Sequence, residues 1–168
     1  MNNEYMLSKQ LMRYLDKDTA IICIGTNKCI GDSLGPIVGT LLTLNCFPLQ
    51  VYGNLNHQIH ALNIDRELSE IYKKFSNSKL IGIDACLGYE KDIGTIKIRN
   101  CALNPGRGVG KTLPKIGTSS IIGIVDSSNN SDSFFNKNIS KSFIMNMAKS
   151  ISRIIFNAYD MYNDSFHD

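Results

Sequence analysis

Apolar residues recur along the chain with two different periods, which together predict alternating helices and strands. Spacings of three and four residues, typical of amphipathic helices, are found at 5–15, 33–45, 61–75 and 139–162. Short apolar runs, or alternating ones, predict strands at 20–24, 47–53, 79–83, 93–99 and 119–125. This alternation predicts an α/β fold, a three-layer α/β/α sandwich with a mostly parallel sheet.

Length and composition narrow the class of protein. The 168 residues are enough for one domain with a substantial core, and we expect a single domain over 1–168. The content of 43% hydrophobic and 20% charged residues is ordinary for a soluble protein, and the net charge of +3 is too small to indicate nucleic acid or membrane binding. We find no membrane span and no secretory signal. Five cysteines without a CxxC pair fit free thiols in a reducing cytoplasm.

Two carboxylates are the first candidates for chemistry. Asp32 lies in a glycine-bearing loop between the strand predicted at 20–24 and the next helix, and Asp84 follows the strand predicted at 79–83. If both strands are parallel, the two side chains emerge at the same sheet edge, where ligands bind in open α/β sheets. One could then act as an acid while the other acts as a base. The pair could instead hold a metal ion, and Asp32 could simply cap the helix after it.

A second loop is rich in glycine. Its end, Gly-Lys-Thr, resembles a phosphate-binding P-loop, but Pro105 stands where that motif needs its first glycine and Pro114 follows where it needs a helix. We therefore exclude nucleotide binding at this loop. The glycines at 106, 108 and 110 could let the backbone bind a substrate or donate N–H groups to an oxyanion, or they could form a plain surface turn. The candidate substrate-binding residues of this loop are Gly106, Gly108 and Gly110.

Two further residues complete the candidate substrate-binding set. Asn27 belongs to the Asp32 loop, and His60 comes directly before the helix predicted at 61–75. A neutral imidazole at that position could serve as a metal ligand or a proton shuttle, which gives Asp32, Asp84 and His60 as the alternative metal set. His57 is expected to be solvated or to cap the helix. Cys86 could form a nucleophile pair with His60, although a small buried thiol is the simpler interpretation.

Three motifs, taken in order, resemble the spore germination protease: GDSLGP at 31–36, IDA at 83–85 and NPGRGVG at 104–110. The chain length and the sequence HALN at 60–63 are similar to the YyaC-type sporulation proteins. The resemblance covers roughly residues 20–125. It implies a phosphorylase/hydrolase-like sandwich of the kind also found in hydrogenase maturation proteases.

The resemblance also implies an activity. It suggests a cytoplasmic endopeptidase of the sporulating cell or forespore, acting in sporulation or germination on peptides or small proteins such as spore proteins. Asp32 and Asp84 match the aspartates thought to act as an acid pair in the germination protease. In the maturation proteases, acidic residues at similar places bind nickel with a histidine. The alternatives are thus a divalent metal cofactor or none, and an inactive peptide-binding protein. The apolar face of the last helix could be core or a homo-oligomer interface.

Overall fold

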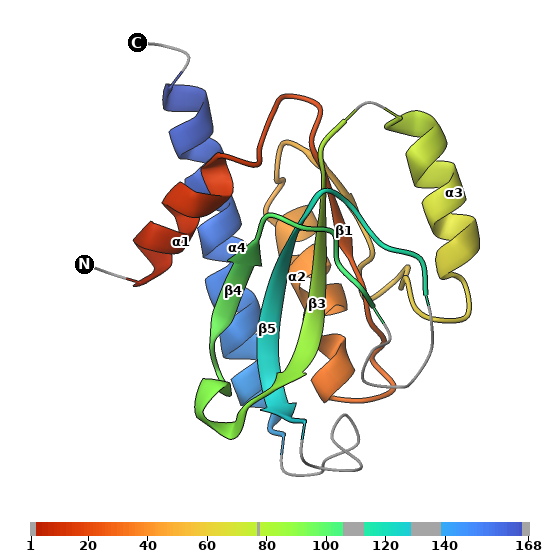
Figure 1. Cartoon of the computed structure of the whole chain (residues 1–168), viewed down its shortest axis with the longest axis vertical. Helices are drawn as coiled ribbons and strands as arrows, with labels where there is room; N and C mark the ends of the chain where they lie inside the picture. Colours follow the sequence, from red (N-terminus) through yellow and green to blue (C-terminus); the bar gives the residue numbers. More distant parts are fainter. Residues whose placement is uncertain (1–2, 77, 106–112, 129–138, 166–168) are drawn as a thin grey trace.

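The computed structural model describes residues 3–76, 78–105, 113–128 and 139–165. Its elements are α1 (Asn3–Met12), β1 (Ala20–Cys23), η1 (Gly31–Ser33), α2 (Leu34–Leu44), β2 (Gln50–Tyr52), α3 (Ile64–Lys74), β3 (Leu80–Gly88), η2 (Glu90–Asp92), β4 (Ile96–Arg99), β5 (Ser119–Ser127) and α4 (Lys141–Asp164). Every helix and strand predicted from the hydrophobic pattern has a counterpart here. The predicted α/β architecture with a mostly parallel sheet is therefore confirmed (Figure 1).

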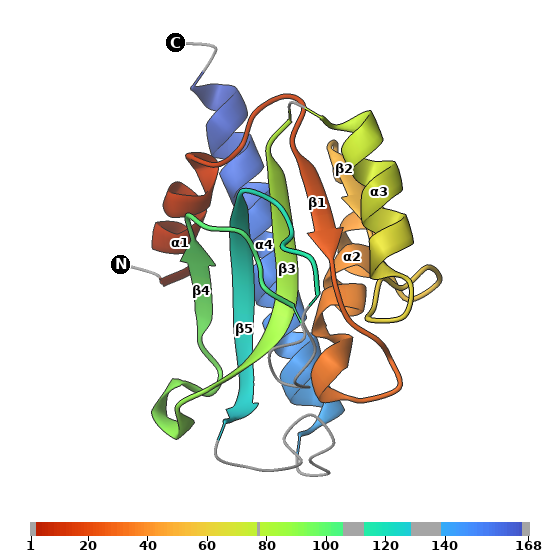
Figure 2. The same cartoon turned by 45° about the vertical axis from the view of Figure 1, so that its right-hand side comes forward.

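The five strands form one sheet in the order β2-β1-β3-β5-β4. Neighbouring strands are parallel, except that β4 runs antiparallel to β5. The chain passes from β1 through α2 to β2 on one side, and then through α3 back across β1 to β3 on the other. The direction of winding therefore reverses between β1 and β3, and the carboxyl ends of these strands flank the switch point where such sheets bind ligands (Figure 2).

Two hydrophobic cores cover the two faces of the sheet. Side chains of α1, α2 and α4 pack on one face, and α3 packs on the other with Leu103 and Ile116 (Figure 1). Alternation along β1 divides its side chains between these cores, since Ile21 and Cys23 join the first and Ile22 joins the second. The apolar face of α4 is buried in the first core, so it is core rather than a free surface.

A glycine sets how closely α2 approaches β1. A Cβ atom at Gly35 would lie 2.0 Å from the carbonyl oxygen of Ile24, so no larger residue fits at this position without moving the helix. This contact fixes the N-terminal end of α2, and with it η1, directly behind the end of β1. Among the described residues, no helix combines the length and apolar character needed to cross a membrane.

The strand β3 is longer than predicted. The hydrophobic pattern places its end before Asp84, but the strand continues to Gly88, so Asp84 lies within it. The pairing with β5 explains the difference, because it extends from Ile81 to Gly88, with a register shift after Cys86. Hydrogen bonding to β5 thus keeps residues 84–88 extended, although they lie beyond the apolar run from which the strand was predicted.

Candidate functional site

Asp84 lies inside β3 and yet at the end of β1. The last residue pair between these strands is Cys23 with Ile83, and the N–H of Ile24 donates to the carbonyl of Ile83 at 2.8 Å. Beyond this point the chain of β1 turns toward Ile59, with which Ile24 forms an isolated bridge. Asp84 therefore lies just beyond the point where β1 ends. This is the edge formed by the carboxyl ends of the strands, where the sequence predicted it.

Asp32 lies at the same edge of the sheet, in the segment that connects β1 to α2. It belongs to η1, which packs against β3. The N–H of Thr26 donates to the backbone carbonyl of Asp32 at 3.0 Å. Gly25 allows this tight loop because its φ is +139° and a Cβ atom there would lie 2.1 Å from the same carbonyl oxygen. The residue at the N-cap of α2 is Ser33, whose hydroxyl donates to Ile30 instead, so the capping interpretation of Asp32 is wrong.

The two carboxyl groups influence each other. Burial raises the pKa of Asp32 to about 6, and a hydrogen bond from the backbone of Thr26 only partly offsets this. Burial also raises the pKa of Asp84 well above its usual value, and the negative charge of Asp32 raises it further, while the backbone of Ala85 lowers it. The two groups are thus close enough to interact, and a proton is retained more readily on Asp84.

Cys29 is a member of this site that sequence reasoning missed. Burial raises the pKa of its thiol, and the nearby negative charge of Asp32 adds to this effect. The thiol therefore stays neutral beside Asp32. The available signal was its position in the same short loop, three residues before Asp32.

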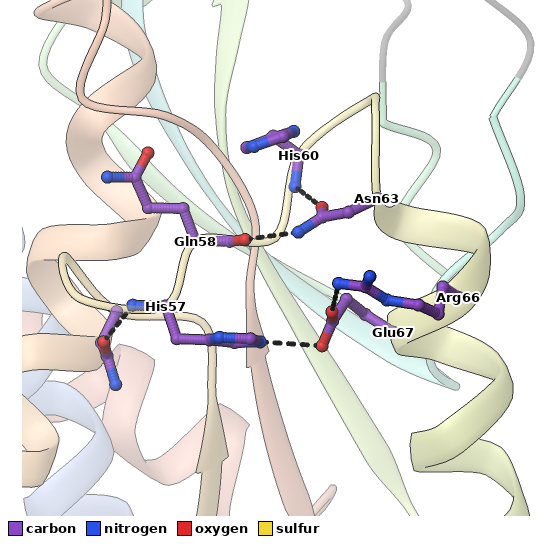
Figure 3. Close-up of polar contacts among 7 residues, drawn as sticks. His57, Gln58, His60, Asn63, Arg66 and Glu67 are labelled. Atoms are coloured by element: carbon purple, nitrogen blue, oxygen red, sulfur yellow. Dashed lines mark hydrogen bonds and ion pairs between the residues drawn. The ribbon is translucent and has the colours of Figure 1, made fainter.

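Asn27 and His60 lie on adjoining loops. The backbone N–H of Asn27 donates to the side chain of Gln58 at 3.1 Å, and the Asn27 residue itself is exposed. The N–H of His60 donates to Asn63 at 2.9 Å, and its Nδ1 accepts from the N–H of Leu62 at 3.3 Å. Figure 3 shows the ring directed away from α3.

His57 belongs to a surface network. Its Nε2 lies 2.9 Å from Glu67, which also accepts from Arg66 at 2.7 Å (Figure 3). The His57 side chain is 63% exposed, as expected for a solvated histidine. Cys86 packs against the second core and its thiol donates to the carbonyl of Leu87 at 3.2 Å, but the residue is only partly buried, unlike the small buried thiol of the simpler interpretation.

The residues that the structure describes contain no group of three or more His, Cys, Asp or Glu side chains that could hold a metal ion. His60 therefore does not join Asp32 and Asp84 in the three-ligand set of the alternative prediction. The reason is local, since the hydrogen bonds to Asn63 and Leu62 fix His60 at the start of α3. A metal ion at this edge would have to rely on the two aspartates.

Gly106, Gly108 and Gly110 lie outside the described residues, so their role stays a prediction. The segments on either side of them are placed: Leu103 and Ile116 pair antiparallel through hydrogen bonds of 2.8 and 2.9 Å. A Cβ atom at Gly82 would lie 2.9 Å from the Leu103 side chain, so this pair covers the face of β3 on which Asp84 also lies, two residues further on.

Comparison with known proteins agrees with this architecture. The family model described as "Protein of unknown function (DUF1256)" matches residues 1–154. The chain is 39% identical over 144 residues to the uncharacterized protein YyaC of Bacillus subtilis (strain 168), covering 85% of this chain and 70% of that protein. The [NiFe] hydrogenase maturation protease HycI from Thermococcus kodakarensis KOD1 has a similar structure, with a TM-score of 0.53 and 16% identity over 88% of this chain and 99% of that chain. The likeness to HycI concerns the fold alone. The family model and the match to YyaC show that the chain belongs to the DUF1256 family of YyaC-like proteins.

Proposed function

We propose that this chain is a peptidase in which Asp32 and Asp84 share one proton and activate water against a peptide carbonyl. The observation that carries the proposal is the interaction of two partly buried carboxyl groups at the switch point of the sheet, with the pKa of each raised. The likeness of the fold to that of a protease is consistent with it. Asp84 is the acid, because both burial and the negative charge of Asp32 raise its pKa, and Asp32 is the base.

The reaction follows from these roles. Asp32 takes a proton from water, whose oxygen bonds to the carbonyl carbon, while Asp84 gives its proton to the carbonyl oxygen. When the tetrahedral intermediate breaks down, Asp84 recovers the hydroxyl proton and Asp32 gives its proton to the amine nitrogen as the C–N bond breaks. The starting protonation state is thereby restored.

The proposal predicts a bell-shaped pH profile. Activity should rise as Asp32 loses its proton around its pKa of about 6, and should fall at higher pH where Asp84 ionises. The two apparent pKa values of the profile belong to the pair, because the groups interact. Activity that does not change with pH around 6, the pKa of Asp32, would contradict the assignment of Asp32 as the base.

A library of internally quenched peptides tests cleavage directly. Asp84→Asn and Asp32→Asn should each lower kcat/KM by about 100-fold or more, the usual contribution of a positioned acid or base. Asp160→Asn is the matched control, because Asp160 is exposed and belongs to the last turns of α4. Figure 1 shows that this helix ends away from the carboxyl ends of the parallel strands. Unchanged turnover in Asp84→Asn, with its fold confirmed by circular dichroism, would refute the catalytic role.

A divalent metal ion held by the two carboxylates is the second candidate, and the closeness of these groups also favours it. Metal analysis of the purified protein, followed by chelation and readdition of single divalent ions, separates the two mechanisms. Cleavage that survives chelation supports the acid–base pair. Peptides that are retained by the protein but never cut would indicate a binding protein without catalysis.

The biological setting rests on the family resemblance. We infer that the substrates are peptides or small proteins of the sporulating cell or forespore, such as spore proteins, and that the enzyme acts in the cytoplasm. Comparing the small proteins of sporulating cells with and without the gene tests this inference. Spore proteins that persist at full length only in the deletion strain would support it, and identical protein profiles would contradict it.

A further inference from the structure

The end of β3 extends past the end of β1. We call residues 84–88 the β3 overhang, because the pairing of β1 with β3 stops at Ile83 while β3 continues to Gly88. Figure 2 shows β3 continuing below the arrowhead of β1. Among the residues that the structure describes, the overhang is paired with β5 on one side only, so its other side is a short strand edge that begins at Asp84.

The hydrogen bonds show which backbone groups face this open edge. The carbonyl of Ile83 accepts from the N–H of Ile24, the residue that follows β1. The backbone N–H and C=O groups of the odd-numbered residues of β3 therefore point toward β1. The carbonyl of Gly88 accepts from the residue that follows β5, so even residues face β5. Along a strand the backbone groups of successive residues point to alternate sides. The groups of Ala85 and Leu87 therefore face the side that β1 has left.

Two of these four groups are already occupied. The N–H of Ala85 hydrogen bonds to the carboxylate of Asp84, and the carbonyl of Leu87 accepts from the thiol of Cys86 at 3.2 Å. Within the described ranges, no hydrogen bond reaches the carbonyl of Ala85 or the N–H of Leu87. Unpaired N–H and C=O groups along a strand edge form a template for pairing with another extended chain. The carbonyl of Ala85 can thus accept, and the N–H of Leu87 can donate, a hydrogen bond from and to the backbone of another extended chain.

We propose that the substrate peptide binds as an extended strand along this edge, donating an N–H to the carbonyl of Ala85 and accepting from the N–H of Leu87. The proposal rests on the proposed peptidase function and defines its substrate class. Strand addition would place the peptide backbone directly beside Asp84. It selects unfolded or extended segments, since folded segments have already paired their backbone groups. Sequence preference would then come from side chains, while the edge itself recognises only backbone.

Backbone methylation of a peptide tests this mode of binding. The probe is a decapeptide chosen from the library, prepared as a series with one N-methyl group at each successive position. Affinity is measured by fluorescence anisotropy with Asp84→Asn, which binds without cutting. Methylation at one position should weaken binding about tenfold, the value of one well-formed hydrogen bond, and methylation of either neighbouring residue should not. Equal affinity across the series, or failure of every peptide to bind, would overturn the proposal.

The protein side offers a complementary variant. Leu87→Pro removes the N–H donor but leaves the β5 ladder intact, because that N–H faces the open edge. Leu87→Ala is the matched control, since it shortens the side chain and keeps the donor. We expect about tenfold weaker binding for the proline variant relative to the alanine variant. Should the proline variant fail to fold, the methylation series on Asp84→Asn still decides.

The two proposals fail in different ways. Normal cleavage by the wild type, together with a flat methylation series, would refute strand addition and leave the aspartate pair standing. A single sensitive position in the series, together with a wild type that cuts no peptide, would refute the peptidase and leave strand addition standing.

Discussion

Replacing Asp32 with Asn should stabilise the folded protein near neutral pH and change its stability little in acid. The pKa of Asp32 rises from 3.8 to about 6 because the carboxyl group is buried. The folded state therefore binds more protons than the unfolded chain between these values, so the free energy of unfolding falls as pH rises through about 6 and then levels off. Each pKa unit is worth about 1.4 kcal/mol, so the loss in the wild type reaches roughly 3 kcal/mol. Asn has the same shape and carries no charge, so it avoids this loss.

Urea unfolding of the wild type and the variant at about pH 3 and about pH 8 measures the effect. The variant should gain up to about 3 kcal/mol over the wild type at the higher pH and almost nothing at the lower one. Asp160→Asn serves as the control and should show no such pH dependence, because Asp160 is exposed. An equal gain at both pH values would show that packing rather than charge is responsible. A loss at the higher pH would refute the argument from burial.

Two further predictions concern the scaffold that holds the site. Gly35→Ala should lower the free energy of unfolding by about 2 kcal/mol or more, because its Cβ would lie 2.0 Å from the carbonyl oxygen of Ile24. Leu44→Ala on the same helix, at a residue that is 75% exposed, should change it by less than about 0.5 kcal/mol in the same urea assay, and equal effects would contradict the packing argument. Arg153→Ala removes the 2.7 Å ion pair with Glu4 that links α4 to α1. It should cost at most about 1 kcal/mol, and less in high salt, whereas a loss above about 2 kcal/mol would show a larger structural role.

The hydrophobic pattern was sufficient to predict the elements because each helix buries one stripe, whereas β1 and β5, which are buried on both faces, form short continuous apolar runs. It was not sufficient to predict the length of β3. A carboxylate followed by Ala85 and Cys86 does not resemble a buried strand, so Asp84 was expected to end it. The actual limit is set by pairing with β5, a contact that the local sequence does not encode. Asp84 nevertheless lies at the carboxyl edge of the sheet, as predicted. The reason is that the neighbouring strand, β1, ends beside it.

Only those residues of the site whose positions follow from the strand topology could be predicted to lie together. Asp32 and Asp84 could be placed together because parallel strands with a crossover bring their carboxyl ends to one edge. His60 and Cys29 depend instead on the conformation of loops. The hydrogen bonds of His60 to Asn63 and Leu62 determine where the histidine is held, and no hydrophobic period reports on them.

The energetics of the aspartate pair argue against a purely structural role. The ion pairs of the described residues involve other carboxylates, so the charge of Asp32 or Asp84 is not balanced by a neighbouring cation there. A buried charge without such a partner lowers stability, and residues that do so without structural gain concentrate at functional sites. If Asp32→Asn proves both more stable at neutral pH and inactive toward peptides, the two results have one cause. In that case the ionised carboxylate would be retained at a cost in stability because the proposed reaction uses its charge.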